Sequence, residues 1–496
     1  MKLKTLLKKA NINTKTIINN HMVNDLKDDS TTVMENDIFF AIKGGQTDGK
    51  HYVNDVILKG AKTIIYEGEI VKEYHHINYI KVINIKRTLA LFCKIYYNDL
   101  TKKIKVIGIT GTNGKTTIST LIFDYLAYSG IDSLLIGTNG VYFKDEHYHT
   151  SNTTINILTT YSILKESIKK GCKYLIMEVS SIGIREARVM YFDFDIIVFT
   201  NLTHDHLDYH KNMTDYKFSK AHLIWDMDYK KDKVVILNKD DDTFDFFSSL
   251  SKTNVLSYGI KEEADYQAQD INKNIYKTNF KIIIRNNTYQ VKSSLIGGFN
   301  IYNLLSVFAV VDFLGFDLLS LVDFLKLYVL VSGRMNRIYY RNRTIIVDFA
   351  HTPNSVLNVL SSIKEFTNHK ITVIIGCGGN RDVAKRSVIA KIATDFADKV
   401  IFTSDNPRDE NPLDIIKDMT IDLKKDNYKS FVDREEAINY ALDNSVHDEV
   451  IAILGKGSER EQIVNGIKYP FSDKEVVYSW ISKNSEKNIK IWYTKK

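Results

Sequence analysis

Residues 111–117 of this 496-residue chain form a glycine loop, GTNGKTT, which constrains the fold more than any other feature. An apolar run at residues 104–109 precedes the loop, and apolar residues then recur at helical spacing as far as Gly130. The segment therefore predicts a strand, a glycine loop and the start of a helix. Such loops bring backbone N–H groups to phosphate oxygens, while the lysine reaches the terminal phosphates and the next hydroxyl can hold Mg²⁺. We interpret it as a nucleoside triphosphate site rather than an ordinary turn, although Ile109 replaces the first glycine of the usual pattern.

Composition excludes several classes of function. The 67 lysines and arginines and 60 aspartates and glutamates leave a net charge of +7, with both signs interspersed, so a nucleic-acid partner is not indicated. The cysteines Cys93, Cys172 and Cys377 lie far apart, which argues against a disulfide framework or structural zinc and fits a reducing cytosol. With no recognisable secretory signal or bilayer-spanning apolar run, we expect a cytoplasmic protein without membrane insertion.

The fold class expected is α/β, in three units: a small N-terminal α/β domain (1–100), a central unit (101–332) and a last unit (333–496). Alternating strand and helix patterns predict a P-loop-type doubly wound parallel sheet in the centre and a Rossmann-like α/β domain at the end. An apolar helix is expected at residues 303–314. Strands are expected at residues 37–42, 63–66, 104–109, 134–136, 174–177, 196–200, 234–237, 281–285, 289–291, 345–348, 372–375, 400–403 and 450–454.

Polar clusters follow many of these strands at their carboxyl ends, where open α/β sheets bind their ligands. One such cluster can arise by chance, but seven predict two facing walls of a site. The clusters lie at residues 111–117, 178–181, 201–210, 348–351, 376–381, 405–408 and 455–457.

Three positions also have an ordinary structural interpretation. Glu178 ends an apolar strand, where it is either a magnesium ligand or a surface glutamate. Residues 204–210 (HDHLDYH) contain three histidines, but zinc motifs pair their ligands across a helical turn or knuckle, so one histidine on Mg²⁺ is the simpler interpretation. Lys220, on a predicted helix after this cluster, is on these grounds an ordinary solvated lysine.

Taken in order, the motifs resemble the Mur ligase family of peptidoglycan synthesis, and within it the ligases that add the third amino acid. Each motif is moderately specific, whereas the ordered set is very specific. The resemblance covers nearly the whole chain, because residues 29–30 and 44–49 are similar to the family's UDP-binding segment. The matching motifs are GTNGKTT (111–117), MEVSS (177–181), NLTHDHLDYH (201–210), GRM (333–335), DFAHTP (348–353), GCGGNRD (376–382), DNPR (405–408) and GKG (455–457).

The resemblance implies an ATP-dependent amide ligase that uses Mg²⁺ and acts on small molecules. We expect the protein to be a monomer, although the sequence does not fix the oligomeric state. The implied reaction joins meso-diaminopimelate to the D-glutamyl residue of UDP-MurNAc-L-Ala-D-Glu through an acyl phosphate. A carboxylate is a poor acyl donor until it carries a phosphate leaving group, so the protein's task is to position the reactants and neutralise charge.

The resemblance also assigns residues to each ligand. Lys115, His206 and Lys220 are implied to be catalytic, with Lys220 carbamylated by CO₂ so that a cation becomes a carboxylate-like ligand. The residues assigned to ATP are Gly111, Thr112, Asn113, Gly114, Lys115, Thr116, Thr117, Asn303, Arg334, Asp348 and His351, and those assigned to Mg²⁺ are Thr116, Glu178, His206 and Lys220. The UDP-linked dipeptide is assigned to Ser30, Gly45, Gln46, Thr47, Asn152, Thr153, Thr154, Ser180, Glu186 and Arg188, and meso-diaminopimelate to Arg386, Asp405, Asn406, Pro407, Arg408, Gly455 and Glu459.

The choice of amino acid rests on Arg408. meso-Diaminopimelate carries a distal carboxylate that L-lysine lacks, and an arginine fork pairs with a carboxylate in bidentate geometry. Pro407 makes the turn rigid and Glu459 is implied to take the distal ammonium, so we expect meso-diaminopimelate rather than lysine; a surface arginine in a turn is the alternative. Three positions depart from the family pattern: Ile182 and Ser458, where histidine is frequent, and Glu186, where glutamine is frequent.

Two other functions share parts of the pattern. Folylpolyglutamate synthase resembles the chain in its glycine loop and also makes a γ-glutamyl amide, but it is not expected to carry the NTT, DHLDYH and DNPR motifs together. A P-loop GTPase or regulatory ATP-binding module would need a base-recognition string such as NKxD, which residues 238–241 (NKDD) match. Phosphate release that needs the UDP-dipeptide and an amino acid together distinguishes a ligase from such a module.

Overall fold

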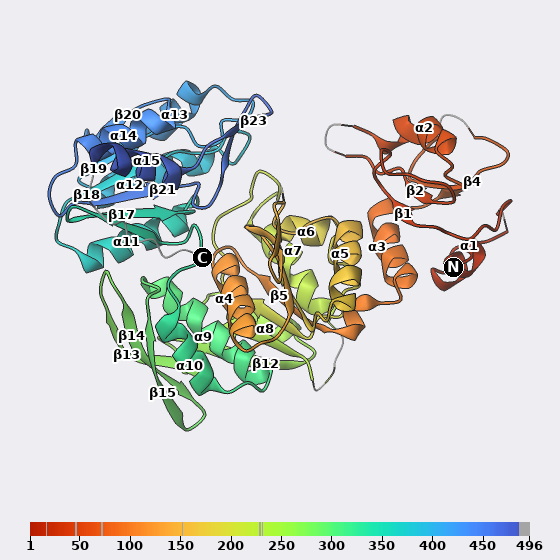
Figure 1. Ribbon diagram of the computed structural model, residues 1–496, viewed down its shortest axis with the longest axis horizontal. Coiled ribbons are helices and arrows are strands. Elements are labelled where there is room, and N and C mark those ends of the chain that lie inside the picture. Colours follow the sequence, from red (N-terminus) through yellow and green to blue (C-terminus); the bar gives the residue numbers. More distant parts are fainter. Residues whose placement is uncertain are drawn as a thin grey trace.

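The computed structural model describes residues 1–15, 17–44, 47–70, 73–150, 152–227, 230 and 232–485. The N-terminal unit lies apart from the last unit, and α3 (Ile85–Tyr96) stands between its sheet and the central sheet (Figure 1). After α3 the ring of Tyr97 stacks on that of Tyr161, with centroids 5.4 Å apart, so aromatic packing joins the N-terminal and central units.

The N-terminal unit is built on a parallel sheet in the order β1-β2-β3-β4. Its two middle strands are buried along their whole length, as expected for a sheet covered on both faces. The elements are α1 (Leu3–Lys9), β1 (Leu26–Lys27), β2 (Ile38–Phe40), η1 (Gly49–Tyr52), α2 (Val53–Leu58), β3 (Thr63–Tyr66) and β4 (Asn78–Lys81).

The central sheet has the order β15-β14-β13-β12-β11-β10-β5-β9-β6-β7-β8, and the strands from β12 to β6 run parallel. Its strands are β5 (Lys105–Thr110), β6 (Ser133–Gly137), β7 (Gly140–Phe143), β8 (Glu146–Tyr148), β9 (Tyr174–Glu178), β10 (Ile196–Phe199), β11 (Val234–Asn238), β12 (Asn254–Gly259), β13 (Tyr266–Lys273), β14 (Thr278–Ile284) and β15 (Asn287–Ser293). Its helices are η2 (Leu100–Lys103), α4 (Lys115–Tyr128), α5 (Ile157–Lys169), α6 (Ser181–Arg185), α7 (Met213–Trp225), α8 (Phe244–Leu250), α9 (Gly298–Phe313) and α10 (Leu318–Leu327).

The last unit has a sheet in the order β16-β17-β21-β18-β19-β20, in which only β16 pairs antiparallel, and a hairpin, β22-β23. Its strands are β16 (Asn336–Tyr340), β17 (Arg343–Asp348), β18 (Ile371–Ile375), β19 (Lys399–Phe402), β20 (Tyr428–Ser430), β21 (Val450–Leu454), β22 (Glu461–Val464) and β23 (Ile467–Pro470). Its helices are α11 (Pro353–Phe366), α12 (Ala384–Phe396), α13 (Pro412–Thr420), α14 (Arg434–Asp443) and α15 (Asp473–Asn484).

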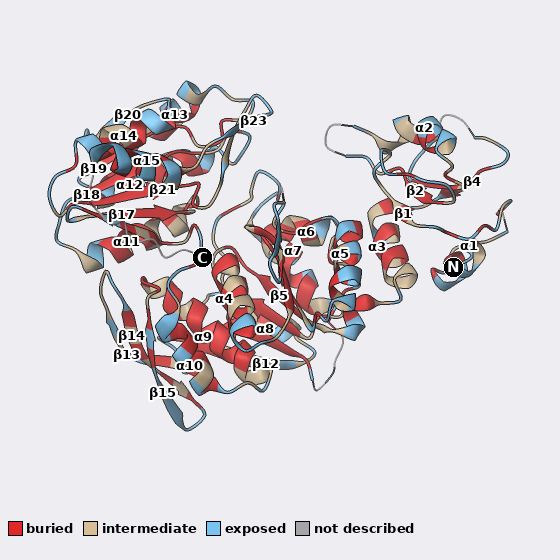
Figure 2. Cartoon of the chain, in the orientation of Figure 1, coloured by how far each residue is buried: buried red, intermediate tan, exposed pale blue. Residues whose placement is uncertain are grey.

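Alternate residues of the parallel strands belong to different hydrophobic cores. In β5, Val106 packs into one core and Ile107 into another, because successive side chains of a strand point to opposite faces. Val373 and Ile374 of β18 divide in the same way, and Figure 2 shows buried strands beneath helices whose outer faces are exposed. Helices therefore cover both faces of these parallel strands, which confirms the predicted α/β class.

A strand is present at every position where the sequence predicts one, and the predicted helix at 303–314 begins earlier, at Gly298. The sequence did not predict the hairpins β7-β8 and β22-β23. β8 and β23 are exposed along their whole length, so they carry no buried apolar alternation from which a strand could be recognised. Among the described helices, none is both long and apolar enough to cross a bilayer.

Candidate active site

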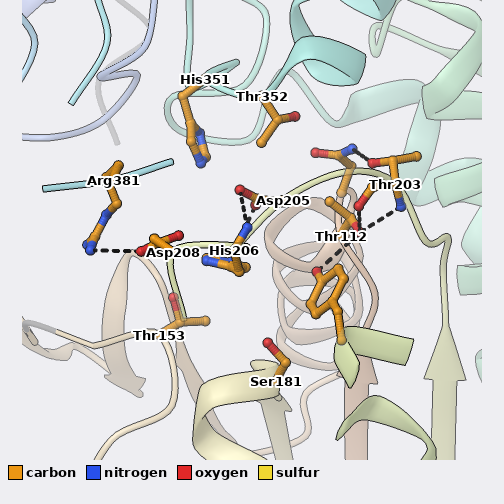
Figure 3. Close-up of polar contacts among 12 residues, drawn as sticks. Thr112, Thr153, Ser181, Thr203, Asp205, His206, Asp208, His351, Thr352 and Arg381 are labelled. Carbon is orange, nitrogen blue, oxygen red and sulfur yellow. Dashed lines mark hydrogen bonds and ion pairs between the residues drawn. The ribbon is translucent and has the colours of Figure 1, made fainter. Parts of the chain in front are cut away.

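A cleft of about 1290 Å³ lies between the carboxyl ends of the central strands and those of the last sheet. Each of the seven polar clusters predicted at strand ends contributes residues to its lining. Figure 3 shows part of it, with Asp205 and His206 of the central unit facing His351 of the last unit. The two walls therefore come from different sheets.

The glycine loop connects β5 to the first turn of α4, as the sequence predicts. Lys115 Nζ donates to the carbonyl oxygens of Gly111 and Thr112 at 2.8 Å each, and burial lowers the pKa of this lysine. Asn201 braces the loop, because its side-chain oxygen accepts from the backbone N–H of Asn113 at 3.0 Å. The loop thus keeps its lysine at the mouth of the predicted phosphate site.

Gly111 is required by space as well as by conformation. Its φ is +137°, and a Cβ there would lie 1.9 Å from Oγ1 of Thr200 on the neighbouring strand end. We expect Gly111→Ala to lower the unfolding free energy by about 1–3 kcal/mol more than Gly130→Ala does. Gly130 is the matched control because its φ is also positive (+73°) while its Cβ would meet nothing within 4 Å. Denaturant unfolding of both variants checks this, and equal losses would contradict the steric argument.

Glu178 is buried at the end of β9, with 1% of its surface exposed, so its interpretation as a surface glutamate is wrong. Its carboxylate accepts from the Thr116 hydroxyl at 3.0 Å and from the backbone N–H and hydroxyl of Thr138 at 2.9 and 3.0 Å. Arg334, from the last unit, donates to the same Thr116 hydroxyl at 2.9 Å. Oxygen atoms of the central wall and a guanidinium nitrogen of the opposite wall therefore meet beside the glycine loop.

The histidines of HDHLDYH diverge instead of converging on a metal. His204 bonds Asp382 at 2.7 Å, and the buried His210 bonds the Ser181 hydroxyl at 2.9 Å. His206 lines the cleft with a φ of +55°, a strained conformation that Asp205 supports by accepting from its backbone N–H at 2.9 Å. Within the described residues, no group of three or more His, Cys, Asp or Glu side chains could hold a metal.

Burial and charge set the protonation of this pair. Burial lowers the pKa of His206 to about 4, although the neighbouring Asp205 opposes the shift. Burial raises the pKa of Asp205, but the charges of His206 and His351 outweigh it and bring that pKa to about 2. At neutral pH the imidazole of His206 is therefore neutral and can act as a ligand.

Lys220 is buried, with 1% of its surface exposed, so its interpretation as a solvated lysine is wrong. Its Nζ donates to the Gly111 carbonyl at 3.0 Å and lies 4.8 Å from the centroid of the Tyr216 ring. Burial, and then the nearby charge of Lys115, hold the pKa of Lys220 well below its usual value. The neutral amine is thus unusually favoured at this position.

On the opposite wall, Asp348 supports its own loop. Its carboxylate accepts from the backbone N–H groups of Met335 and Ala350 at 2.7 Å each, which ties the GRM segment to the end of β17. His351 bonds the Phe349 carbonyl through Nδ1 at 2.8 Å. Asn303, from α9 of the central unit, reaches the glycine loop, since a Cβ at Gly114 would lie 2.5 Å from its Oδ1.

The DNPR and GKG segments form the far end of the cleft. Arg408 has a φ of +53° and donates from Nη1 to the Gly379 carbonyl at 2.7 Å. Glu459 Oε2 accepts from Lys456 Nζ at 2.7 Å and from Asn406 at 3.0 Å. Burial raises the pKa of the Glu459 carboxyl. Arg408 is partly buried and lines the cleft.

Some assigned residues do not line the cleft. Arg386 is almost fully buried, and its guanidinium bonds Glu410 at 2.8 Å and Asp418 at 2.8 Å, so it supports the DNPR segment from behind. Glu186 pairs with Lys86 of α3. The lining also lacks Gly111, Thr154 and Pro407, which are buried, and Ser30 and Thr47 of the N-terminal unit. Gly45 and Gln46 fall outside the described residues.

The remaining assigned residues do line it: Thr112, Asn113, Gly114, Lys115, Thr116, Thr117, Asn152, Thr153, Glu178, Ser180, Arg188, His206, Lys220, Asn303, Arg334, Asp348, His351, Asp405, Asn406, Arg408, Gly455 and Glu459. Asp205, Asp208 and Arg381 also line it; they lie in predicted polar clusters but were assigned to no ligand. Sequence reasoning missed Thr138 and Lys385, which line it as well. Thr138 follows the predicted strand at 134–136, so the strand-end rule could have found it.

The NKDD string does not form a free base-recognition site. Asn238 donates to the Thr200 carbonyl at 3.3 Å. The carboxylate of Asp241 accepts from the backbone N–H groups of Leu202 at 3.1 Å and Thr243 at 3.0 Å. Both side chains are occupied by the loops they support, which argues against the GTPase interpretation.

Comparison with known proteins gives consistent matches. Family models for the Mur ligase middle domain and the Mur ligase, glutamate ligase domain match residues 109–311 and 333–457. The chain is 36% identical to UDP-N-acetylmuramoyl-L-alanyl-D-glutamate--2,6-diaminopimelate ligase of Bacillus licheniformis (92% of this chain, 93% of the relative) and 36% identical to that of Oceanobacillus iheyensis (95% and 96%). A solved structure of a ligase of the same name superposes with a TM-score of 0.68, at 29% identity, over 96% of this chain and 98% of the other.

Proposed function

The chain belongs to the Mur ligase family, and we propose on this basis that it joins meso-diaminopimelate to the D-glutamyl residue of UDP-MurNAc-L-Ala-D-Glu at the expense of ATP. One observation carries the proposal: a single cleft holds the glycine-loop Lys115 on one wall and Arg408 on the other. A ligase must bring a triphosphate and an amino acid to the same carboxylate, and this cleft offers a cation for each.

The proposed reaction has two steps. The D-glutamyl carboxylate attacks the terminal phosphorus of ATP, so that an acyl phosphate forms and ADP leaves. The neutral amine then attacks the acyl carbon, phosphate leaves, the amine loses a proton and the amide forms. Lys115 and the loop N–H groups neutralise charge on the phosphates, and Arg334, Asn303, Asp348 and His351 complete the ATP site from the sides.

The residues beside the loop fit magnesium. The Thr116 hydroxyl and the Glu178 carboxylate both offer oxygen ligands, which magnesium prefers. The three groups that donate hydrogen bonds to this carboxylate are all neutral. With His206 and a carbamylated Lys220 they would hold an ion that neutralises phosphate charge when bound. Carbamylation is favoured because the neutral amine of Lys220 is the form that reacts with CO₂.

Each unit has one proposed role. Residues 1–100 would bind the uridine end through Ser30, Gly45, Gln46 and Thr47, residues 101–332 would bind ATP, and residues 333–496 the amino acid. The acyl-dipeptide would reach the cleft along Asn152, Thr153, Thr154, Ser180, Glu186 and Arg188. Arg188 is held for this role by donating to the Thr154 carbonyl at 2.8 Å.

ATP consumption with UDP-MurNAc-L-Ala-D-Glu against a panel of amino acids tests the proposal. We expect ADP release only when the UDP-dipeptide and meso-diaminopimelate are both present, with L-lysine a poor substrate. Preference for lysine would favour the lysine-adding version of the enzyme. Turnover with a folate and glutamate would favour folylpolyglutamate synthase, and release without any amino acid would favour a regulatory ATPase.

Arg408 should control the choice of amino acid. Arg408→Ala should reduce the preference for meso-diaminopimelate over lysine by roughly 2–3 kcal/mol, because the distal carboxylate loses its partner. The ratio of kcat/KM values for the two amino acids measures this. Arg285→Ala, at an arginine whose side chain is 78% exposed, is the control and should leave the ratio unchanged. An unchanged ratio in Arg408→Ala would contradict the assignment.

A further inference from the structure

Two loops from different sheets touch across the cleft. The loop after β10 carries His204 and Asp208, and the loop after β18 carries Arg381 and Asp382. His204 Nε2 lies 2.7 Å from Asp382 Oδ2, and Arg381 Nη1 lies 3.6 Å from Asp208 Oδ2. Figure 3 shows the second pair, with Arg381 reaching from the last unit to Asp208. We call these two pairs the loop bridge.

On one side the loop bridge is fastened to the amino-acid end of the cleft. Arg408 Nη1 donates to Gly379, in the same loop as Arg381, and Asp409 donates its backbone N–H to Asn380 Oδ1 at 3.2 Å. The backbones are also in close contact, because a Cβ on Gly379 would lie 1.9 Å from the Pro407 carbonyl oxygen. A shift of this loop therefore shifts Arg408.

On the other side it is fastened to the phosphate end. Thr203, next to His204, donates its backbone N–H to Thr112 Oγ1 of the glycine loop at 3.0 Å, and that hydroxyl bonds the Thr203 carbonyl at 3.2 Å. In the sequence, His206 lies between His204 and Asp208, the two residues that this loop contributes to the loop bridge. Its backbone has the strained conformation described above. The loop after β10 thus moves with the phosphate site.

Stability alone does not account for the bridge. His204 and Arg381 are about half exposed (46% and 47%), and a salt bridge as exposed as that of Arg381 contributes little to folding. The charge of Asp208 also matters, because Arg381 and Arg408 carry like charges near each other. Burial and then the charge of Arg381 lower the pKa of Arg408, whereas the carboxylates of Asp405, Glu459 and, after them, Asp208 oppose both.

We propose that His204, Asp208, Arg381 and Asp382 are positioning residues that hold Arg408 at a set distance from the phosphate site, so that their loss weakens amino-acid binding before it affects ATP. The inference rests on the proposed function. It assigns no direct substrate contact to Arg381, whose partner is Asp208.

A charge exchange tests the bridge. Asp208→Arg and Arg381→Asp, each alone, should raise the KM for meso-diaminopimelate about tenfold or more while the KM for ATP changes less than about threefold. The double variant Asp208→Arg/Arg381→Asp should return the amino-acid KM to within about threefold of wild type, because the pair is restored with reversed polarity. The exposed pair Glu166–Lys169 on α5, 2.8 Å apart, is the matched control, and its exchange should change neither constant.

This pair suits the exchange better than His204–Asp382, because Asp382 also accepts from the Ala384 backbone N–H at the start of α12. If the arginine at 208 prevents folding, Asp208→Asn keeps the shape without the charge and should raise the same KM about threefold. If the double variant has an amino-acid KM as high as that of Arg381→Asp, the proposal is overturned and a direct substrate contact is favoured. Equal increases in the KM for ATP and the KM for the amino acid would also overturn it. Failure of the proposed function is separate, because wild type would then show no ligation in the same assay.

Discussion

An alanine at position 115 should abolish ligation while the protein stays folded. Lys115 Nζ makes its hydrogen bonds to two carbonyls of its own loop, Gly111 and Thr112, so its removal breaks no hydrogen bond that these contacts make to another element. During phosphoryl transfer, however, the loss of this cation leaves charge on the phosphates without a partner in a partly buried site. We expect the rate to fall by roughly 10²–10³-fold or more.

ADP release with all three substrates, together with a circular dichroism spectrum and melting curve, separates catalysis from folding. Lys169→Ala removes an exposed lysine that pairs with Glu166 on α5, and it should leave activity unchanged. Near-normal turnover in a folded Lys115→Ala protein would refute the assignment of the glycine loop to ATP.

The sequence predicted the parts of the fold that depend on buried repetition. The strand at 104–109 and the run at 450–454 are buried along most or all of their length, so their apolar letters identify them. The hairpin β22-β23 lies against Arg408, with the Arg408 backbone N–H bonded to the Ile463 carbonyl at 3.0 Å, but its residues are only partly buried or exposed. Its position depends on a neighbour that local pattern does not reveal.

The site residues, too, were predictable only where they depend on local sequence pattern. Strand-end polar residues such as Glu178 were predictable, because parallel strands bring their carboxyl ends to one edge. Whether a given side chain faces the cleft depends on partners distant in sequence. Arg386 is turned away by Glu410 and Asp418, and Lys220 is buried by the glycine loop more than 100 residues before it, where it bonds Gly111.

Lys220→Ala should be nearly inactive, and short carboxylic acids should restore part of its activity. As a free cation Lys220 is badly placed: it is buried, Lys115 lies near enough to lower its pKa, and its bonds go to the Gly111 carbonyl and the Thr110 hydroxyl. A depressed pKa increases the neutral fraction near neutral pH, and the neutral amine attacks CO₂. An N–C bond forms, a proton is lost, and the side chain becomes an anion that pairs with the nearby cation Lys115.

The rescue experiment follows from the chemistry of the carbamate anion on Lys220. Alanine leaves space where a carboxylate would stand, so acetate or propionate can enter and offer the same oxygens, and activity should recover by roughly 10-fold or more with the acid. Lys217→Ala, on the same helix with its ammonium over the Phe246 ring, is the control and should keep full activity without response to carboxylates. Wild type should lose activity when bicarbonate is removed and give a carbamate signal with ¹³C-labelled bicarbonate. A fully active Lys220→Ala protein would show that the buried lysine serves the fold alone.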